Sequence, residues 1–170
     1  PSDNKVAPRG VITFHNYVGN YGNTTMARKA THGVQTNGQP NKYGKAPFVY
    51  VANSNSTPQV MRLQDVIDGL SSTMAFSETL KGQYSDLRGF GWWRGGSHFE
   101  TYLAPNTSQP DVVEQAQFCN TQHPNPPCVG PTTANPETIA ARSRHPGGVG
   151  VVMCDGSYKF ITDGVNLDTW

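Results

Sequence analysis

The clearest pattern of apolar and polar residues lies near the carboxyl end, where Val149–Cys154 is apolar at every position except Gly150. The turn-forming residues Asp155–Ser157 follow, and the apolar residues of Tyr158–Ile161 then surround Lys159. Two such runs around an Asp-Gly pair predict a β-hairpin, because Asp and Gly tolerate the backbone angles of a tight turn. We expect the first run to be a central strand covered on both faces, and Lys159 to point outward.

Five other segments have patterns typical of short elements. Strand composition is found in Gly10–His15, Pro47–Val51 and Thr73–Leu80. Met61–Leu70 spaces its apolar residues by three and four, which predicts one or two helical turns that stop at Gly69. Asp111–Phe118 predicts one helical turn capped by Asp111.

Composition indicates the fold class. The chain of 170 residues is long enough for one domain with a real core, and its 18 glycines and 13 prolines are typical of a turn-rich protein. Two polar stretches, at about residues 27–46 and 104–137, are expected to be long loops, apart from the helical turn at Asp111–Phe118. We therefore predict a single domain over residues 1–170, mainly β with minor helix and a loop-rich antiparallel sheet.

Charge and hydropathy exclude some functions. The net charge of +1 offers no electrostatic basis for binding nucleic acid or an anionic membrane. No stretch of the sequence is apolar over the length that crosses a bilayer.

Three cysteines suggest an internal cross-link. Cys119 and Cys128 flank a Pro- and Asn-rich segment that has no other means of holding a shape, so we expect a disulfide between them. Metal binding with His123 is the alternative, although the spacing fits no usual zinc pattern. Cys154 lies in the apolar run and is expected to pack as a small hydrophobe.

The densest aromatic stretch, residues 85–102, is the candidate ligand surface. Neighbouring residues of a strand point to opposite faces, so one of the two adjacent tryptophans is expected to be partly exposed. An exposed indole beside cationic and imidazole groups can stack on a sugar ring or on a partner protein. The alternative is packing under the loops. The candidate residues are Trp92, Trp93, Arg94, His98 and Tyr102.

Candidate catalytic and metal-binding groups are sparse. Glu78 lies in a predicted strand, where an ion pair with Arg88, Arg142 or Arg144 is the simplest explanation of a half-buried carboxylate. The chain has no G-x-S-x-G, H-E-x-x-H, phosphate-binding or EF-hand motif. Asp163 and Asp168 form a weak candidate calcium loop, which fits a helix cap equally well. We expect no other cofactor.

A motif of His145, nine residues, then Asp155-Gly156 lies near the carboxyl end. A straight strand would separate His145 from Asp155 too far for contact, so we expect Asp155 to accept hydrogen bonds within the turn and His145 to bond a neighbouring backbone group. Arg144, His145, Asp155 and Gly156 are therefore interpreted as structural.

This motif resembles the carboxyl-terminal signature of a family of bacterial prepilin-like surface proteins, abundant in planctomycetes and known as domain of unknown function 1559. Further matches occur in the same order along nearly the whole chain, at Pro1–Asp3, Asn16-Tyr17, Gly19-Asn20, Leu63–Gly69, Ser77-Glu78, Gly91–Trp93, Pro105-Asn106, Pro110-Asp111, Pro126–Cys128 and Arg142–Gly148.

The resemblance implies a pseudopilin-like head domain whose amino-terminal helix is missing from this sequence. It implies an extracellular or cell-surface location, with anchoring by an amino-terminal segment that is absent from this chain. Other copies of the chain, surface proteins and polysaccharide are the expected partners, and nucleic acid is not.

Three hypotheses of function follow. The first is a non-enzymatic extracellular head domain for filament or surface assembly, or for adhesion, through the Trp92/Trp93 edge. The second is a carbohydrate-binding module that uses the exposed aromatic residues. The third is a glycoside-active enzyme that uses Glu78 with Asp86 or Asp111. The sequence favours a protein that is not an enzyme.

Overall fold

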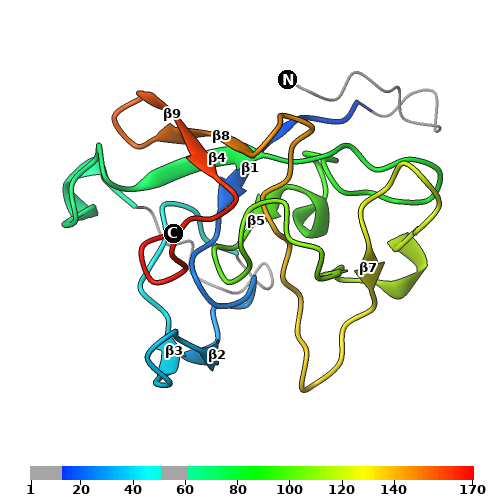
Figure 1. The fold of residues 1–170 in the computed structure, drawn as a ribbon, viewed down its shortest axis with the longest axis horizontal. Helices are drawn as coiled ribbons and strands as arrows, with labels where there is room; N and C mark the ends of the chain where they lie inside the picture. The colour runs from blue at the N-terminus through cyan, green and yellow to red at the C-terminus, as the bar shows by residue number, and fades with distance from the viewer. Residues whose placement is uncertain (1–12, 51–60) are drawn as a thin grey trace.

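The computed structural model describes residues 13–50 and 61–170, which form a mainly β domain around one five-stranded sheet (Figure 1). The strand order is β5-β1-β4-β8-β9, and the β1–β5 pair is parallel while the other pairs are antiparallel. The prediction of a mainly β fold with little helix is confirmed. The five strands are β1 (Tyr17–Asn20), β4 (Met74–Glu78), β5 (His98–Phe99), β8 (Gly148–Met153) and β9 (Tyr158–Thr162).

The predicted carboxyl-terminal hairpin is the β8–β9 pair, in register from Gly148 opposite Thr162 to Val152 opposite Tyr158. Strand β8 lies between β4 and β9, so it is an interior strand as expected. The expected cover on both faces is confirmed, since every residue of β8 except the half-buried Val152 is buried. The two faces are covered by different groups: Val149 and Val151 pack in the apolar core, whereas Gly150 on the other face lies beneath the ring of Tyr158.

The hydrophobic core lies against the inner face of this sheet. Val18, Phe99, Val149, Val151 and Met153 belong to the strands, and Ala141 and Trp170 pack against them from outside the sheet. Burial of each large apolar side chain contributes roughly 1.5–3 kcal/mol, so this cluster is the main apolar source of stability.

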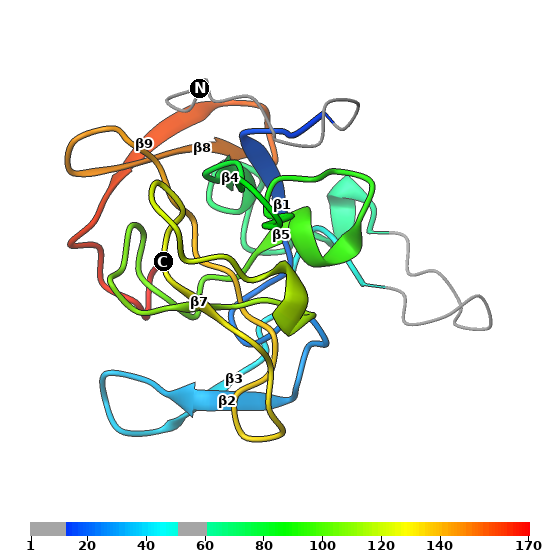
Figure 2. The ribbon, with the colours of Figure 1, turned by 90° about the vertical axis from the view of Figure 1, so that its right-hand side faces the viewer.

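The predicted loop at about residues 27–46 contains a hairpin, which corrects that prediction. Strand β2 (Thr31–Val34) pairs with β3 (Pro40–Lys42), and in both views the hairpin lies at the end of the molecule away from β8 and β9 (Figures 1 and 2). The turn is an Asn37-Gly38 pair with φ of +81° at Gly38, the residue type that tight hairpin turns favour.

The second predicted loop, 104–137, also contains short regular elements. Strand β6 (Asp111–Val112) pairs in parallel with β7 (Cys128–Val129). The expected helical turn over Asp111–Phe118 is therefore divided into β6 and a 3₁₀ turn, η3 (Ala116–Phe118). Asp111 pairs with buried arginines instead of capping a helix.

Three other local predictions need correction. Met61–Leu70 forms only the 3₁₀ turn η1 (Leu63–Asp65), in which the Asp65 carboxylate accepts a hydrogen bond from the Arg62 backbone N–H. Residues 47–50 and 13–15 are not strands; the remaining residues of those two predicted strands lie outside the described part of the chain. Phe48 instead packs its ring over Gly19, which needs no strand pairing.

A third 3₁₀ turn, η2, spans Arg94–Gly96. Among residues 13–50 and 61–170, no helix has both the length and the apolar character needed to cross a bilayer.

Candidate functional site

The Trp92–Trp93 loop places its two indoles in different environments, but the pair lies in a turn and not in the strand that the expectation assumed. Trp92 is 88% exposed, whereas Trp93 is partly buried and meets the Phe118 ring edge-on, with 5.1 Å between ring centroids. The Trp93 ring lies so close to Gly95 that an added Cβ there would be 2.6 Å from it. Arg94 pairs with Glu114, so this cation is already neutralised.

His98 is not on the surface. Its imidazole is fully buried between two carboxylates, with Nδ1 2.8 Å from Glu100 Oε1 and Nε2 3.1 Å from Glu137 Oε1. Burial alone would lower the pKa of His98, but the two glutamates outweigh it and raise the pKa to about 10. The imidazolium holds strand β5 to the segment around Glu137 and cannot contact a ligand.

Tyr102 belongs to a third environment. Its ring packs against His32, with 4.4 Å between centroids, and lies directly over Gly33 of strand β2. The five residues of the predicted surface are therefore divided among three places. Only Trp92, Trp93 and Arg94 lie in one loop.

The motif residues at the carboxyl end have structural contacts. Asp155 Oδ1 accepts hydrogen bonds from the Ser157 backbone N–H at 2.8 Å and from its hydroxyl at 2.6 Å. These bonds lower the pKa of Asp155. Gly156 has φ of +84°, which the turn requires, and the Arg144 guanidinium donates to the Pro124 carbonyl at 3.4 Å.

His145 contacts a carboxylate instead of the expected backbone group. Its Nε2 lies 3.3 Å from Glu78 Oε1, and the other Glu78 oxygen accepts a hydrogen bond from the Gly150 backbone N–H at 2.7 Å. The predicted ion pair of Glu78 with an arginine is therefore wrong. The reason is that Arg88 and Arg142, two of the three candidate partners, bind aspartates elsewhere.

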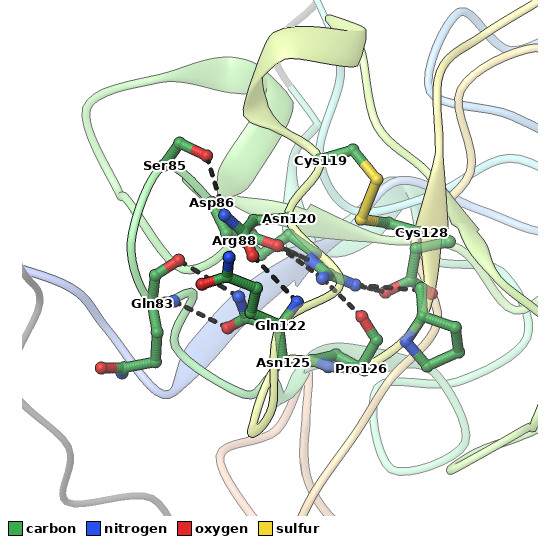
Figure 3. Close-up of polar contacts among 12 residues, drawn as sticks. Gln83, Ser85, Asp86, Arg88, Cys119, Asn120, Gln122, Asn125, Pro126 and Cys128 are labelled. Carbon is green, nitrogen blue, oxygen red and sulfur yellow. Dashed lines mark hydrogen bonds and ion pairs between the residues drawn. A yellow bond between two sulfur atoms is a disulfide. The ribbon is translucent and has the colours of Figure 1, made fainter.

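Arg88 is the centre of a buried ionic network (Figure 3). Its guanidinium donates to Asp86 Oδ2 at 2.5 Å and to Asp111 Oδ2 at 2.6 Å, and all three side chains are almost fully buried. It also donates to the carbonyls of Pro126 and Pro127, at 2.8 and 3.3 Å. Asp86 and Asp111 are thus held by a shared cation away from solvent, so neither can flank a glycosidic bond with Glu78.

Arg142 extends the network. It binds the Asp111 carboxylate at 2.8 Å and donates to the carbonyls of Thr107 and Gln109 at 2.5 and 2.8 Å. The two arginines therefore satisfy four loop carbonyls. A buried cation with this set of partners is a structural clamp for the 104–137 segment.

The predicted disulfide is confirmed: Cys119 and Cys128 are bonded, with Cα atoms 5.6 Å apart. The bridge closes the loop that contains Pro126, an Arg88 partner, as Figure 3 shows. Cys154 is free and partly buried, at the end of β8.

The two candidate calcium ligands have different partners. Asp163 accepts a hydrogen bond from the Asn106 side chain at 2.8 Å, and Asp168 binds Thr36 of the β2–β3 hairpin. Within the described residues, no three His, Cys, Asp or Glu side chains are grouped as a metal site would need.

The outer face of the sheet is an aromatic surface that sequence reasoning missed. Phe76 of β4 is 39% exposed, and Tyr158 and Phe160 of β9 are 60% and 45% exposed. Tyr158 and Phe160 lie over Gly150 and Gly148 of β8. Phe48 meets Phe76 with 4.9 Å between centroids. We call Phe48, Phe76, Tyr158 and Phe160 the outer aromatic face.

A signal for this face exists in the sequence. Strand β8 alternates glycine with large apolar residues, and β9 opposite it has aromatic residues at alternate positions. Because alternate residues share one face, glycines opposite aromatics indicate rings that lie flat on the sheet.

These observations define a mainly β domain with one open sheet, buried ion pairs that hold its loops, and an exposed aromatic face. The chain belongs to the family described as "Protein of unknown function (DUF1559)", which matches residues 1–168. Comparison with curated proteins and with solved structures finds no match.

Proposed function

We propose that this chain is the non-enzymatic head domain of a prepilin-like protein at the cell surface, where it assembles with other copies of itself. The observation that supports the proposal is the outer aromatic face. Monomeric proteins rarely leave several large aromatic side chains together on the surface, and such patches are typical of association sites. The Cys119–Cys128 disulfide fits an oxidising environment outside the cytoplasm.

A second copy of the chain is the occupant that we propose. Tyr158 and Phe160 lie on β9, which is also the last strand of the sheet and has a free edge within the described residues. A two-fold axis beside β9 would bring the same two rings of each copy together and continue the sheet from one copy to the next. The ring contact and the sheet extension would both use the same surface on each copy, which is how the subunits of a symmetric dimer meet.

The acidic groups support a role without catalysis. Asp86 and Asp111 are bound to Arg88, Glu100 and Glu137 to His98, and Glu78 to Gly150 and His145. Each of these carboxylates serves to hold one part of the chain to another.

The test is sedimentation velocity of the chain over a range of concentrations, with and without the paired substitutions Tyr158→Ser and Phe160→Ser. We expect a concentration-dependent dimer whose dissociation constant rises at least about tenfold in the double variant, equivalent to about 1.4 kcal/mol. Val34→Ser is the control, because Val34 is an apolar residue even more exposed than Tyr158 and Phe160 but lies on the β2–β3 hairpin.

Two results would contradict the proposal. One is a monomer at every concentration, which would leave the face to a different partner. The other is association that the double variant leaves unchanged while Trp92→Ala abolishes it, since that result would place the interface at the Trp92 loop.

A further inference from the structure

A polar pocket of about 170 Å³ lies between the β2–β3 hairpin and the carboxyl-terminal turn. The hairpin is at the lower end of the molecule in Figure 1, and the carboxyl-terminal segment lies above it. Tyr102, Trp170, Val34 and Leu167 form the less polar part of the wall. The other lining residues carry amide, hydroxyl or carboxylate groups: Asn23, Gln35, Thr36, Asn41, Thr101 and Asp168.

Specific contacts fix the walls of this pocket. Gly33 has φ of +72°, and an added Cβ there would lie 2.3 Å from the Tyr102 ring, so the hairpin rests directly on that ring. Asp168 accepts hydrogen bonds from both the backbone N–H and the hydroxyl of Thr36. The buried Trp170 indole N–H donates to the Leu103 carbonyl at 3.0 Å. The Thr36–Asp168 contact thereby joins segments more than 130 residues apart in the sequence at the wall of one pocket.

The pocket retains unused hydrogen-bonding capacity. Within the part of the chain that the structure describes, neither the Gln35 side-chain amide nor the Tyr102 hydroxyl is hydrogen-bonded. Asn41 and Asn23 are linked through their side chains at 3.0 Å, which leaves a second amide N–H on Asn41. The amides of Gln35 and Asn41, the Tyr102 hydroxyl and the Asp168 carboxylate thus offer hydrogen-bond donors and acceptors to a ligand in the pocket.

We infer that this pocket binds a single neutral sugar residue. None of its lining residues is a lysine or arginine, so it offers no counter-charge for an anion. Asp168 is the only lining carboxylate, which is too few ligands for a metal ion. Amides and a carboxylate suit the paired hydroxyls of a pyranose, and an aromatic wall suits its C–H face.

The size of the pocket limits the ligand. Pockets for drug-sized molecules have volumes of roughly 300–1,000 Å³, so this one accommodates one ring and not an oligosaccharide. The inference goes beyond the proposed assembly, because none of the pocket residues belongs to the outer aromatic face. It also differs from sugar stacking on Trp92, which is not part of the pocket.

The test is an NMR titration of the ¹⁵N-labelled chain with four neutral methyl glycosides, those of glucose, mannose, galactose and N-acetylglucosamine. At concentrations up to about 50 mM, millimolar affinities are measurable. We expect one glycoside to give saturable shifts of the Trp170 indole N–H and of the hairpin amides, with the Trp92 indole unchanged. Glucuronate and glucosamine are the charged comparisons.

Two pairs of variants locate the binding. Gln35→Ala removes an amide of the pocket, and Gln39→Ala removes one from the same hairpin outside it. Asp168→Asn changes the carboxylate of the pocket, and Asp163→Asn changes the carboxylate bound to Asn106. Each pocket variant should weaken binding about 3- to 10-fold, the effect of one hydrogen bond, and each control less than about 2-fold.

Several outcomes would overturn the inference: no saturable shift with any neutral glycoside, shifts centred on Trp92, tighter binding of a charged sugar, or equal effects of the pocket and control variants. Within the described residues the Gln35 side chain makes no hydrogen bond, so Gln35→Ala still tests the pocket if Asp168→Asn unfolds the protein. A titration without sugar binding would not change the sedimentation result expected for the proposed dimer. The two proposals are therefore tested separately.

Discussion

Outside the apolar core of the inner face, two regions reverse the usual distribution of polar and apolar residues: the buried ion pairs that hold the loops, here called the loop side, and the outer face of the sheet. On the loop side, Arg88, Asp111 and His98 are charged and almost fully buried. On the outer face, Tyr158 and Phe160 are aromatic and exposed. Ordinary domains bury aromatic side chains and expose charges, so both sides need a specific explanation.

The loop side teaches what holds long irregular segments together. Loops leave backbone carbonyls without partners, and buried carbonyls must be satisfied. Arg88 and Arg142 supply donors to four of them, and the aspartates neutralise the guanidinium charges. The outer face needs no buried side-chain donors for its carbonyl groups, because its backbone is paired in strands. If the proposed assembly is right, stability and binding are separated, because ion pairs hold the loops and the aromatic face is the surface proposed for association.

The largest expected effect is that of removing the central cation. Arg88→Met leaves Asp86 and Asp111 buried without their shared partner, and should lower the free energy of unfolding by about 3–5 kcal/mol. Urea unfolding monitored by circular dichroism measures this. The comparison variant is Arg94→Met, which removes a pair between the half-exposed Arg94 and the largely buried Glu114 and should cost less, about 1–2 kcal/mol. Equal effects would show that burial does not distinguish the two pairs.

The second effect is a dependence of stability on pH through His98. Its folded pKa is raised from 6.5 to about 10, so its stabilising contribution is complete below pH 6.5 and is lost as the pH rises toward 10. By linkage, the rise from 6.5 to about 10 corresponds to at most about 5 kcal/mol, which is the upper bound on the fall in the free energy of unfolding across this window. Burial also raises the pKa of Glu137, although the His98 charge opposes that rise; this shift lowers stability as the pH rises from 4.5, so it begins below the His98 window.

Urea unfolding at several pH values tests this prediction with His98→Asn. The variant should be less stable at neutral pH and should lose most of the decline between neutral and alkaline pH. His123→Asn is the control, because His123 is exposed and its removal should preserve the decline. A decline that persists in His98→Asn would assign the titration to other groups.

The smallest effect concerns the two adjacent tryptophans. Trp93→Ala removes the contact with Phe118 and should cost about 2 kcal/mol, less than for a fully buried ring. Trp92→Ala should change stability by less than about 0.5 kcal/mol, since its ring is exposed. Thermal unfolding of both variants checks the difference. A large loss in Trp92→Ala would mean that the ring contributes to packing.

Local patterns predicted the elements that local chemistry determines. The β8–β9 hairpin follows from the Asp155-Gly156 turn between two apolar runs, and the Cys119–Cys128 bridge follows from a short cysteine spacing. The Asn37-Gly38 turn was equally local, but its flanking residues lack the alternation that marks strands. The β2–β3 hairpin was therefore missed.

Long-range contacts explain the remaining errors. His98 is buried because Glu137, 39 residues away, lies beside it, and no local pattern identifies that pair. Glu78 contacts His145, while Arg88 and Arg142, two of its three expected arginine partners, bind aspartates, a competition that only the assembled loops determine. The polar pocket likewise depends on Asp168 meeting Thr36, a contact between segments that share no sequence pattern.

The tip of the β8–β9 hairpin has a practical use. Asp155, Gly156 and Ser157 are exposed, and the space around Gly156 is open. A short epitope inserted after Gly156 would be accessible to antibodies and would leave both strand ladders and the buried ion pairs in place. Immunogold labelling of intact cells that carry such an insertion would show directly where the protein resides.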